Sequence, residues 1–269
     1  MKVNFEKFDS IETFMKVIET RPKNKIMRCA NSSVTGTYDF TGTHTFEEAQ
    51  DLLKNGYDKP LEKMKSEVAK DLKIQQSRPR RTPRNAVVGF VPNVPNYLLG
   101  IPEQMITIQQ TAQKTKTINI LYFIGNNCGT SANELEEAGI KILNVINRLE
   151  LSGIRVNLDV VVKCTYCSGE WQIASINVKG YKEHMDIKKL CFPLAHPSMF
   201  RRFGFAWLER SKNMKSNFSI TYGCSATTHD EKELQKIFGE NNFFITQDHA
   251  GKLSVDKIME LIKNFNKKS

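Results

Sequence analysis

One continuous stretch, residues 118–163, most constrains what this chain can fold into. It begins with a run of apolar residues from Ile118 to Ile124, passes through a polar loop into an amphipathic helix, and ends in alternating apolar and polar residues from Ile154 to Val162. Ser131 followed three residues later by Glu134 is typical of a capping box at a helix start. Strand, helix and strand in this order predict a right-handed parallel crossover, whose functional edge lies at the carboxyl ends of the strands.

The helix of this unit has one apolar face at a period of 3.6 residues and ends before Gly153. We therefore predict an α/β fold: three layers, with a mostly parallel sheet flanked by helices. The apolar face consists of Leu135, Ala138, Ile142, Val145, Ile146 and Leu149.

The N-terminal part of the chain has a different character, with short predicted helices and extended segments. Ile11–Ile18 reads as a helix, and Thr45 with Glu48 forms a second capping box. We expect residues 1–76 to form a small α+β extension, residues 77–85 to form a basic linker, and residues 86–269 to form the α/β domain.

The composition is that of an ordinary soluble protein, with 40% hydrophobic and 25% charged residues. No window of about 18 apolar residues exists, which excludes a spanning helix and argues against a membrane partner. The first residues lack the apolar core of a signal peptide. We therefore expect the protein to be cytoplasmic.

The net charge of +10 favours phosphate-rich or acidic partners. Much of it is local, because the segment 77–84 places four arginines among two prolines, and proline excludes a helix there. Exposed arginines in this segment are candidate nucleic-acid contacts. The alternative is a solvated linker. The candidates are Arg78, Arg80, Arg81 and Arg84.

Six cysteines are scattered along the chain, and a reducing compartment would keep them as thiols. Cys164 and Cys167 have the two-residue spacing of a zinc knuckle or a redox pair. A zinc site needs further ligands, for which only scattered residues are available. Reduced thiols at a strand end are the alternative. The scattered residues are His184, Cys191, Cys224 and His229.

The segment Val87–Pro102 combines prolines and glycines with many apolar residues. We expect it to be irregular and to pack down, either as a structural wrap over the sheet or as a partner-binding surface that includes Asn93 and Asn96.

His196 and Ser198 are the nearest approach to a catalytic pair, but no G-x-S-x-G motif accompanies them. A histidine that caps a turn is the favoured interpretation.

Several segments of the chain resemble those of known protein families. The strand, polar loop and helix from Ile118 to Val162, with the Gly-Ile-Arg-Val entry to the second strand, resemble the opening of a von Willebrand factor A-type domain. Three further segments extend a resemblance to an uncharacterised family encoded by tailed bacteriophages. That resemblance implies a phage protein in the cytoplasm of the infected host, or one carried in a virion. The three segments are 40–49, 92–95 and 192–205.

A-type domains commonly bind a divalent ion through Asp-x-Ser-x-Ser in the loop after their first strand, and the ion recruits an acidic group of a partner. The corresponding loop here has no aspartate, so it should bind Mg²⁺ poorly. We expect no metal or cofactor. Free N–H groups at the helix start could still hold a phosphate or carboxylate, and a plain capped helix is the alternative. The candidate partner-binding residues of this loop are Asn126, Asn127, Thr130 and Ser131.

Three hypotheses follow. The first, which we favour, is a non-catalytic binding protein that engages a macromolecular partner, most simply a protein, through its A-like domain. The second is a nucleic-acid-binding protein of phage replication or packaging. The third is a zinc protein or enzyme using Cys164, Cys167 and His196. The sequence leaves the oligomeric state open.

Overall fold

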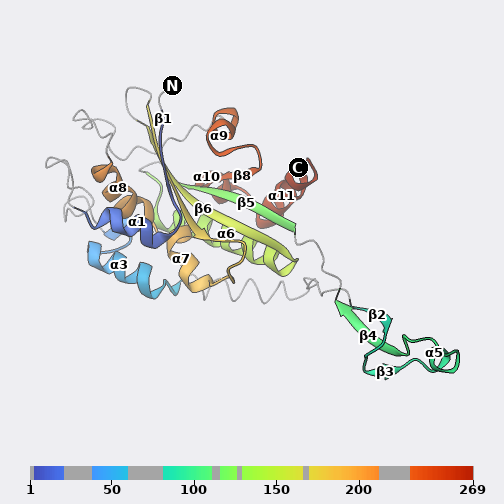
Figure 1. Cartoon of the computed structure of the whole chain (residues 1–269). Coiled ribbons are helices and arrows are strands. Elements are labelled where there is room, and N and C mark those ends of the chain that lie inside the picture. The colour runs from blue at the N-terminus through green and yellow to red at the C-terminus, as the bar shows by residue number, and fades with distance from the viewer. Residues whose placement is uncertain are drawn as a thin grey trace.

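The computed structural model contains a helix-covered five-stranded sheet and a separate three-stranded sheet (Figure 1). The residues that it describes are 3–20, 38–59, 81–110, 116–125, 129–165, 170–211 and 231–268.

The five-stranded sheet has the order β1-β7-β6-β5-β8. Three of its four pairings are parallel, and β6 with β7 is antiparallel. The sheet is therefore mixed, with mostly parallel pairings, and the predicted α/β class is confirmed. The strands are β1 (Val3–Phe8), β5 (Lys116–Ile124), β6 (Ile154–Thr165), β7 (Trp171–Lys179) and β8 (Asn242–Thr246).

The predicted strand-helix-strand unit is β5, α6 (Ala132–Leu151) and β6. The capping box is present, since Glu134 N donates to Ser131 Oγ at 3.3 Å and Ser131 N donates to Glu134 Oε2 at 3.1 Å. Gly153 follows the helix with a φ of 83°, a value that favours glycine. These local signals therefore define α6 as the helix that connects the parallel strands β5 and β6, and its apolar face lies in the core.

The two faces of the sheet are covered unequally. In the described part of the chain, seven α-helices and the π-helical turn Met199–Gly204 contribute buried residues to the main core, in which Tyr122 and Trp207 are fully buried. Among the described residues the other face is covered by α9 (Glu231–Phe238), whose Leu234 packs near Leu121 and Phe123. The helices on the main core are α1 (Ile11–Ile18), α3 (Phe46–Asn55), α6, α7 (Ile187–Ala195), α8 (Phe205–Arg210), α10 (Gln247–Lys252) and α11 (Val255–Lys268).

The N-terminal strand belongs to the main sheet, in contrast to the expected extension of residues 1–76. β1 pairs in parallel with β7, and the Nε1–H of Trp207 on α8 donates to Glu6 Oε2 at 2.8 Å. Phe14 of α1 lies in the same core. The reason is physical: a six-residue strand pattern predicts a strand but does not encode which strand it pairs with.

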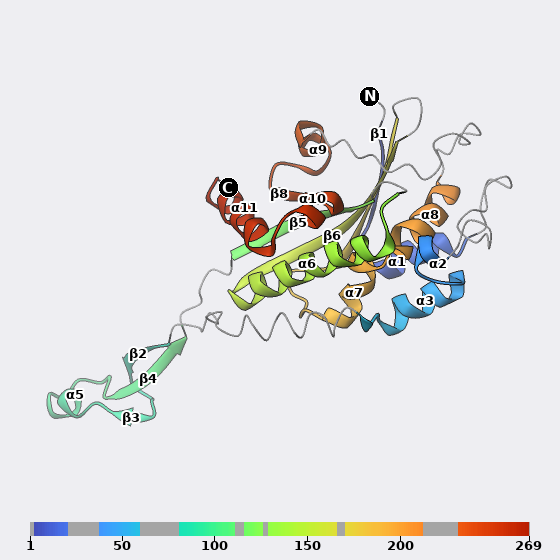
Figure 2. The same ribbon diagram turned by 180° about the vertical axis from the view of Figure 1, so that it is seen from behind.

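Residues 81–110 form an arm, as we name this segment, that projects from the body in both views (Figures 1 and 2). It contains three antiparallel strands in the order β2-β4-β3, with α5 (Val94–Leu98) at its far end. The expected linker 77–85 thus overlaps a strand, and Pro83 is accommodated because β2 is an edge strand. The strands are β2 (Arg81–Ala86), β3 (Val91–Pro92) and β4 (Met105–Gln110).

Candidate functional site: the carboxyl edge of the sheet and the arm

A cavity of about 310 Å³ lies where β5 ends and α6 begins. Its walls come from the first turn of α6, from α2 (Tyr38–Thr41), from the residues after α3 and from the turn after α7. It therefore occupies the edge that the strand order of the sheet predicts for a site. Its principal side chains are Tyr38, Tyr57, Lys59, Ser131, Glu136 and His196.

Glu136 is the buried charged residue in the wall of this cavity, and it is only 3% exposed. Its Oε2 accepts from the Tyr57 hydroxyl at 3.0 Å and from the Lys59 ammonium at 3.1 Å. Burial, reinforced by the negative charge of Glu136, raises the pKa of Tyr57 well above its usual value, so its hydroxyl keeps its proton and donates. The buried carboxylate is thus stabilised by a donor and by a cation.

His196 is buried against two aromatic rings. Its ring stacks on Phe192 at 4.7 Å between centroids and meets the Tyr57 ring edge-on at 4.8 Å. The backbone N–H of Ser198 donates to His196 Nδ1 at 3.1 Å, and the Ser198 hydroxyl donates to the Thr41 carbonyl at 2.6 Å. The two side chains are therefore engaged with the backbone, which is the arrangement of a histidine that caps a turn.

The environment of His196 predicts a pH-dependent stability. Burial, the largest cause, lowers its pKa from 6.5 to about 4, although the charge of Glu136 acts the other way. Below pH 6.5 the imidazole of His196 is protonated in the unfolded chain but stays neutral in the folded chain. The free energy of unfolding therefore falls as the pH falls toward 4. We expect this histidine alone to cost about 2 kcal/mol between roughly pH 7 and pH 5.

The check is denaturant unfolding of wild type and His196→Asn across that pH range. Asparagine keeps an acceptor for the Ser198 N–H and does not titrate. The contributions of all other titratable groups therefore cancel when the unfolding free energies of the two proteins are subtracted. Parallel pH dependences for both proteins would contradict the prediction.

Two buried arginines support this edge, and sequence reasoning missed them. Arg201 donates to the carbonyls of Phe40 and Thr130, both at 2.7 Å, and Arg202 donates to Thr43 Oγ1 at 2.7 Å. They connect the π-helical turn to α2 and to the loop after β5. The only sequence signal was a pair of arginines within an otherwise apolar run.

The structure describes only part of the predicted site in the loop after β5. Ser131 lines the cavity while its hydroxyl caps α6, and the Thr130 carbonyl is held by Arg201. Asn126 and Asn127 lie outside the described residues.

In the arm, the predicted asparagines stabilise the turn itself. Asn93 Oδ1 accepts from Asn96 N at 3.4 Å, Asn93 Nδ2 donates to Asn85 Oδ1 at 3.0 Å, and Asn96 Nδ2 donates to the Glu103 carbonyl at 2.8 Å. The apolar residues between and beside them are exposed, in contrast to the expectation that this segment packs down. The exposed set is Val87, Val88, Phe90, Val91, Val94, Tyr97, Leu98, Leu99, Ile101 and Ile108.

The structure describes only two of the four predicted arginines, and both lie on β2. Arg84 is exposed on β2, Arg81 is placed only by its backbone, and Arg78 and Arg80 lie outside the described residues.

The cysteines that the structure describes are buried. Cys164 lies in the main core and Cys167 is outside the described residues. Burial raises the pKa of the Cys191 thiol to about 12, so it stays protonated. Within the described ranges, no three histidine, cysteine or acidic side chains are placed to share a metal ion.

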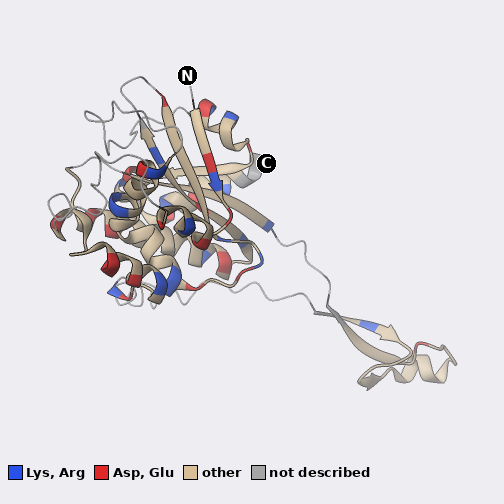
Figure 3. Ribbon diagram, turned by 60° about the vertical axis from the view of Figure 1, so that its left-hand side comes forward, with Lys and Arg blue, Asp and Glu red and all other residues tan. Residues whose placement is uncertain are grey.

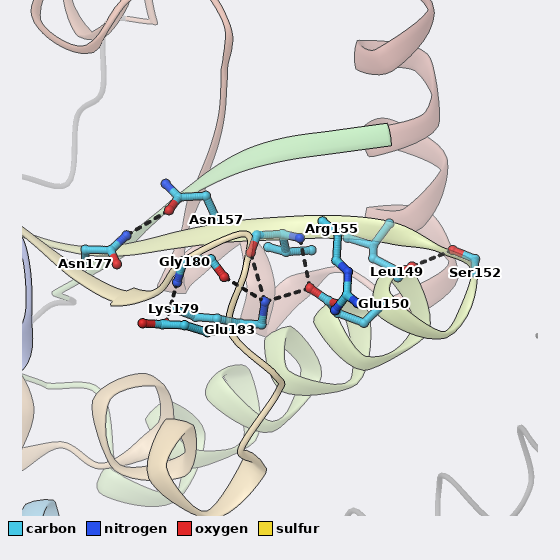
Figure 4. A network of polar contacts seen from close by, with 10 residues as sticks. Leu149, Glu150, Ser152, Arg155, Asn157, Asn177, Lys179, Gly180 and Glu183 are labelled. Carbon is cyan, nitrogen blue, oxygen red and sulfur yellow. Dashed lines mark hydrogen bonds and ion pairs between the residues drawn. The ribbon is translucent and has the colours of Figure 1, made fainter. Parts of the chain in front are cut away.

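A second polar cluster lies at the other end of α6 (Figure 4). The ammonium of Lys179 donates to Glu150 Oε1 at 2.7 Å, and Glu150 also accepts from Arg155 at 3.0 Å and from the Val156 N–H at 2.9 Å. Glu150 thus connects the last turn of α6 to the start of β6 and the end of β7.

Fold and surface together define a mixed α/β protein whose exposed apolar residues are concentrated on a projecting arm. The chain belongs to the family described as Domain of unknown function (DUF7192), whose model matches residues 2–265. No curated protein and no solved structure matches the chain. No helix in the described part of the chain is both long and apolar enough to cross a membrane.

Proposed function

We propose that this chain is a non-catalytic binding protein that engages a macromolecular partner through its arm, carried on a von Willebrand factor A-like domain encoded by a bacteriophage. One observation carries the proposal: ten of the thirteen exposed large apolar side chains among the described residues belong to the arm. A concentration of exposed apolar side chains of this kind marks an interaction site, because contact of apolar surface with water is unfavourable.

The arm also lacks a core of its own. No residue from Pro83 to Ile108 is buried. Ordering a backbone costs about 1–2 kcal/mol per residue, and a small sheet needs a packed apolar face to offset that cost. Burial of the apolar side chains against a partner supplies such a face.

The edges of the arm favour contact through side chains over the addition of a strand. Its two edge strands are β2 and β3, which contain Pro83 and Pro92. Proline lacks an N–H and blunts an edge strand. We therefore expect the partner to pack on the exposed apolar side chains of the arm, including those of α5.

The test places a photo-crosslinking amino acid at Tyr97 of the arm or at Tyr38 of the cavity, in the full chain and in the cells that produce it. Both tyrosines are exposed, at 65% and 51%, so the two positions are matched in accessibility. We expect a covalent adduct with a macromolecule from position 97, which Leu98→Asp with Leu99→Asp abolishes.

An adduct from position 38 alone would indicate that the partner binds at the cavity and not at the arm. The absence of an adduct from both positions would overturn the proposal. An adduct that nuclease removes would favour the second candidate, a nucleic-acid-binding protein. That candidate is supported by the net charge of +10 and by Arg84 on β2. Action in the cytoplasm of an infected host stays a prediction of the resemblance.

A further inference from the structure

The arm has an unusual charge content for this chain. Its thirty residues include only Arg81, Arg84 and Glu103 as charged residues, so nearly all of the net charge of +10 lies elsewhere. Figure 3 shows the same contrast, since the arm is almost entirely tan while the helices of the body carry many basic and acidic residues. The arm is thus a nearly neutral apolar surface attached to a basic body.

We infer that the arm binds the arm of a second copy of this chain, so that two chains form a symmetric dimer joined at their tips. The inference rests on the proposed function, because it names the partner that the arm engages. A twofold axis presents the same patch from both chains, and an apolar patch is its own complement.

The described body offers no alternative apolar surface for an arm to bind. Its remaining exposed large apolar side chains are Phe5, Tyr38 and Leu261, which lie singly on β1, α2 and α11. Among the described residues, the surface that matches the arm is therefore another arm.

The area of the arm is sufficient for a stable dimer. The ten apolar side chains are exposed by 38% to 81%, and they present on the order of 1,000 Å² together. A standard interface needs about 800 Å² from each partner.

The charge distribution favours a dimer in which the arms are in contact and the bodies are far apart. Two basic bodies repel each other, with a range of about 10 Å at moderate salt. Contact through nearly neutral arms that project from the bodies keeps the like charges apart (Figures 1 and 3). Body-to-body contact would bring them together.

The experiment is sedimentation velocity on the purified full chain over a concentration range of roughly 1–100 µM, in which a micromolar or tighter dimer is populated. Three proteins are compared: wild type, Leu98→Asp with Leu99→Asp, and Lys182→Glu. The control changes the net charge by the same two units on an exposed residue of the body. Circular dichroism confirms that all three are folded.

We expect wild type and Lys182→Glu to dimerise, and the arm variant to associate at least about 100-fold more weakly. Added salt should leave the dimer intact or tighten it, because the contact is apolar and the bodies repel. A wild type that is monomeric throughout, or a dimer that the arm variant keeps, would overturn the inference. The proposed function would still stand if the probe at Tyr97 captured a different macromolecule, and would fall with no adduct.

Discussion

Replacing Lys179 with methionine is expected to lower the free energy of unfolding by about 3 kcal/mol, because a largely buried carboxylate loses one of its two cations and two backbone carbonyls lose their donor. The Lys179 side chain is 2% exposed. Its ammonium donates to Glu150 Oε1, to the Val156 carbonyl at 3.1 Å and to the Gly180 carbonyl at 3.2 Å, so all three protons have acceptors (Figure 4). Methionine fills the same volume and satisfies none of these groups. Urea unfolding followed by tryptophan fluorescence measures the change.

Two further variants isolate the buried pair. Lys252→Met removes an ion pair to Asp248 in which both side chains are largely exposed, and we expect a change below about 1 kcal/mol. Glu150→Leu combined with Lys179→Met should be less unstable than the sum of the single changes, because no uncompensated charge remains. Equal effects of Lys179→Met and Lys252→Met would contradict the buried network.

Gly139→Ala is expected to lower the free energy of unfolding by about 3 kcal/mol, although alanine is the better helix former. Gly139 lies in α6, and a Cβ added there would stand 2.3 Å from the Leu194 carbonyl oxygen and 2.3 Å from the Ala195 Cα, both backbone atoms of α7. Backbone cannot move aside by rotating a side chain, so α6 and α7 must separate. Thermal and urea unfolding measure the loss.

Gly251→Ala is the matched control, since it makes the same change in α10 where no atom lies within 4 Å of the added Cβ. We expect it to be neutral or stabilising by up to about 1 kcal/mol. If Gly139→Ala were as stable as wild type, the close contact between α6 and α7 would be refuted.

The parts of the fold that the sequence predicted are those encoded by neighbours along the chain. The capping box of Ser131 and Glu134 identifies the start of α6, and the alternation after Gly153 identifies β6. The predicted cap at Thr45 starts α3, since Thr45 Oγ1 accepts from Glu48 N, although Glu48 Oε2 accepts from the N–H of His44 and not from that of Thr45. In each case the residues that make the signal also make the contact, so the pattern is sufficient.

The candidate sites were predictable only in outline. The sequence indicated the loop after β5 and the segment around Asn93, yet the groups that form the cavity come from four separate places in the chain. The role of Asn93 also differs: it holds a turn that presents apolar neighbours to solvent. Whether an apolar residue is covered depends on what lies above it in space, which a local pattern does not record.

The sequence alone was enough to predict the α/β class and the crossover from β5 through α6 to β6, because the strand and helix patterns follow one another directly along the chain. It was also enough to predict the caps that begin the helices, because each cap is made by residues three positions apart. The tertiary structure alone decided that β1 joins β7, that Arg201 and Arg202 support the carboxyl edge, and that the arm exposes its apolar residues. These depend on contacts between residues far apart in the chain, which form only where the whole fold brings their elements together.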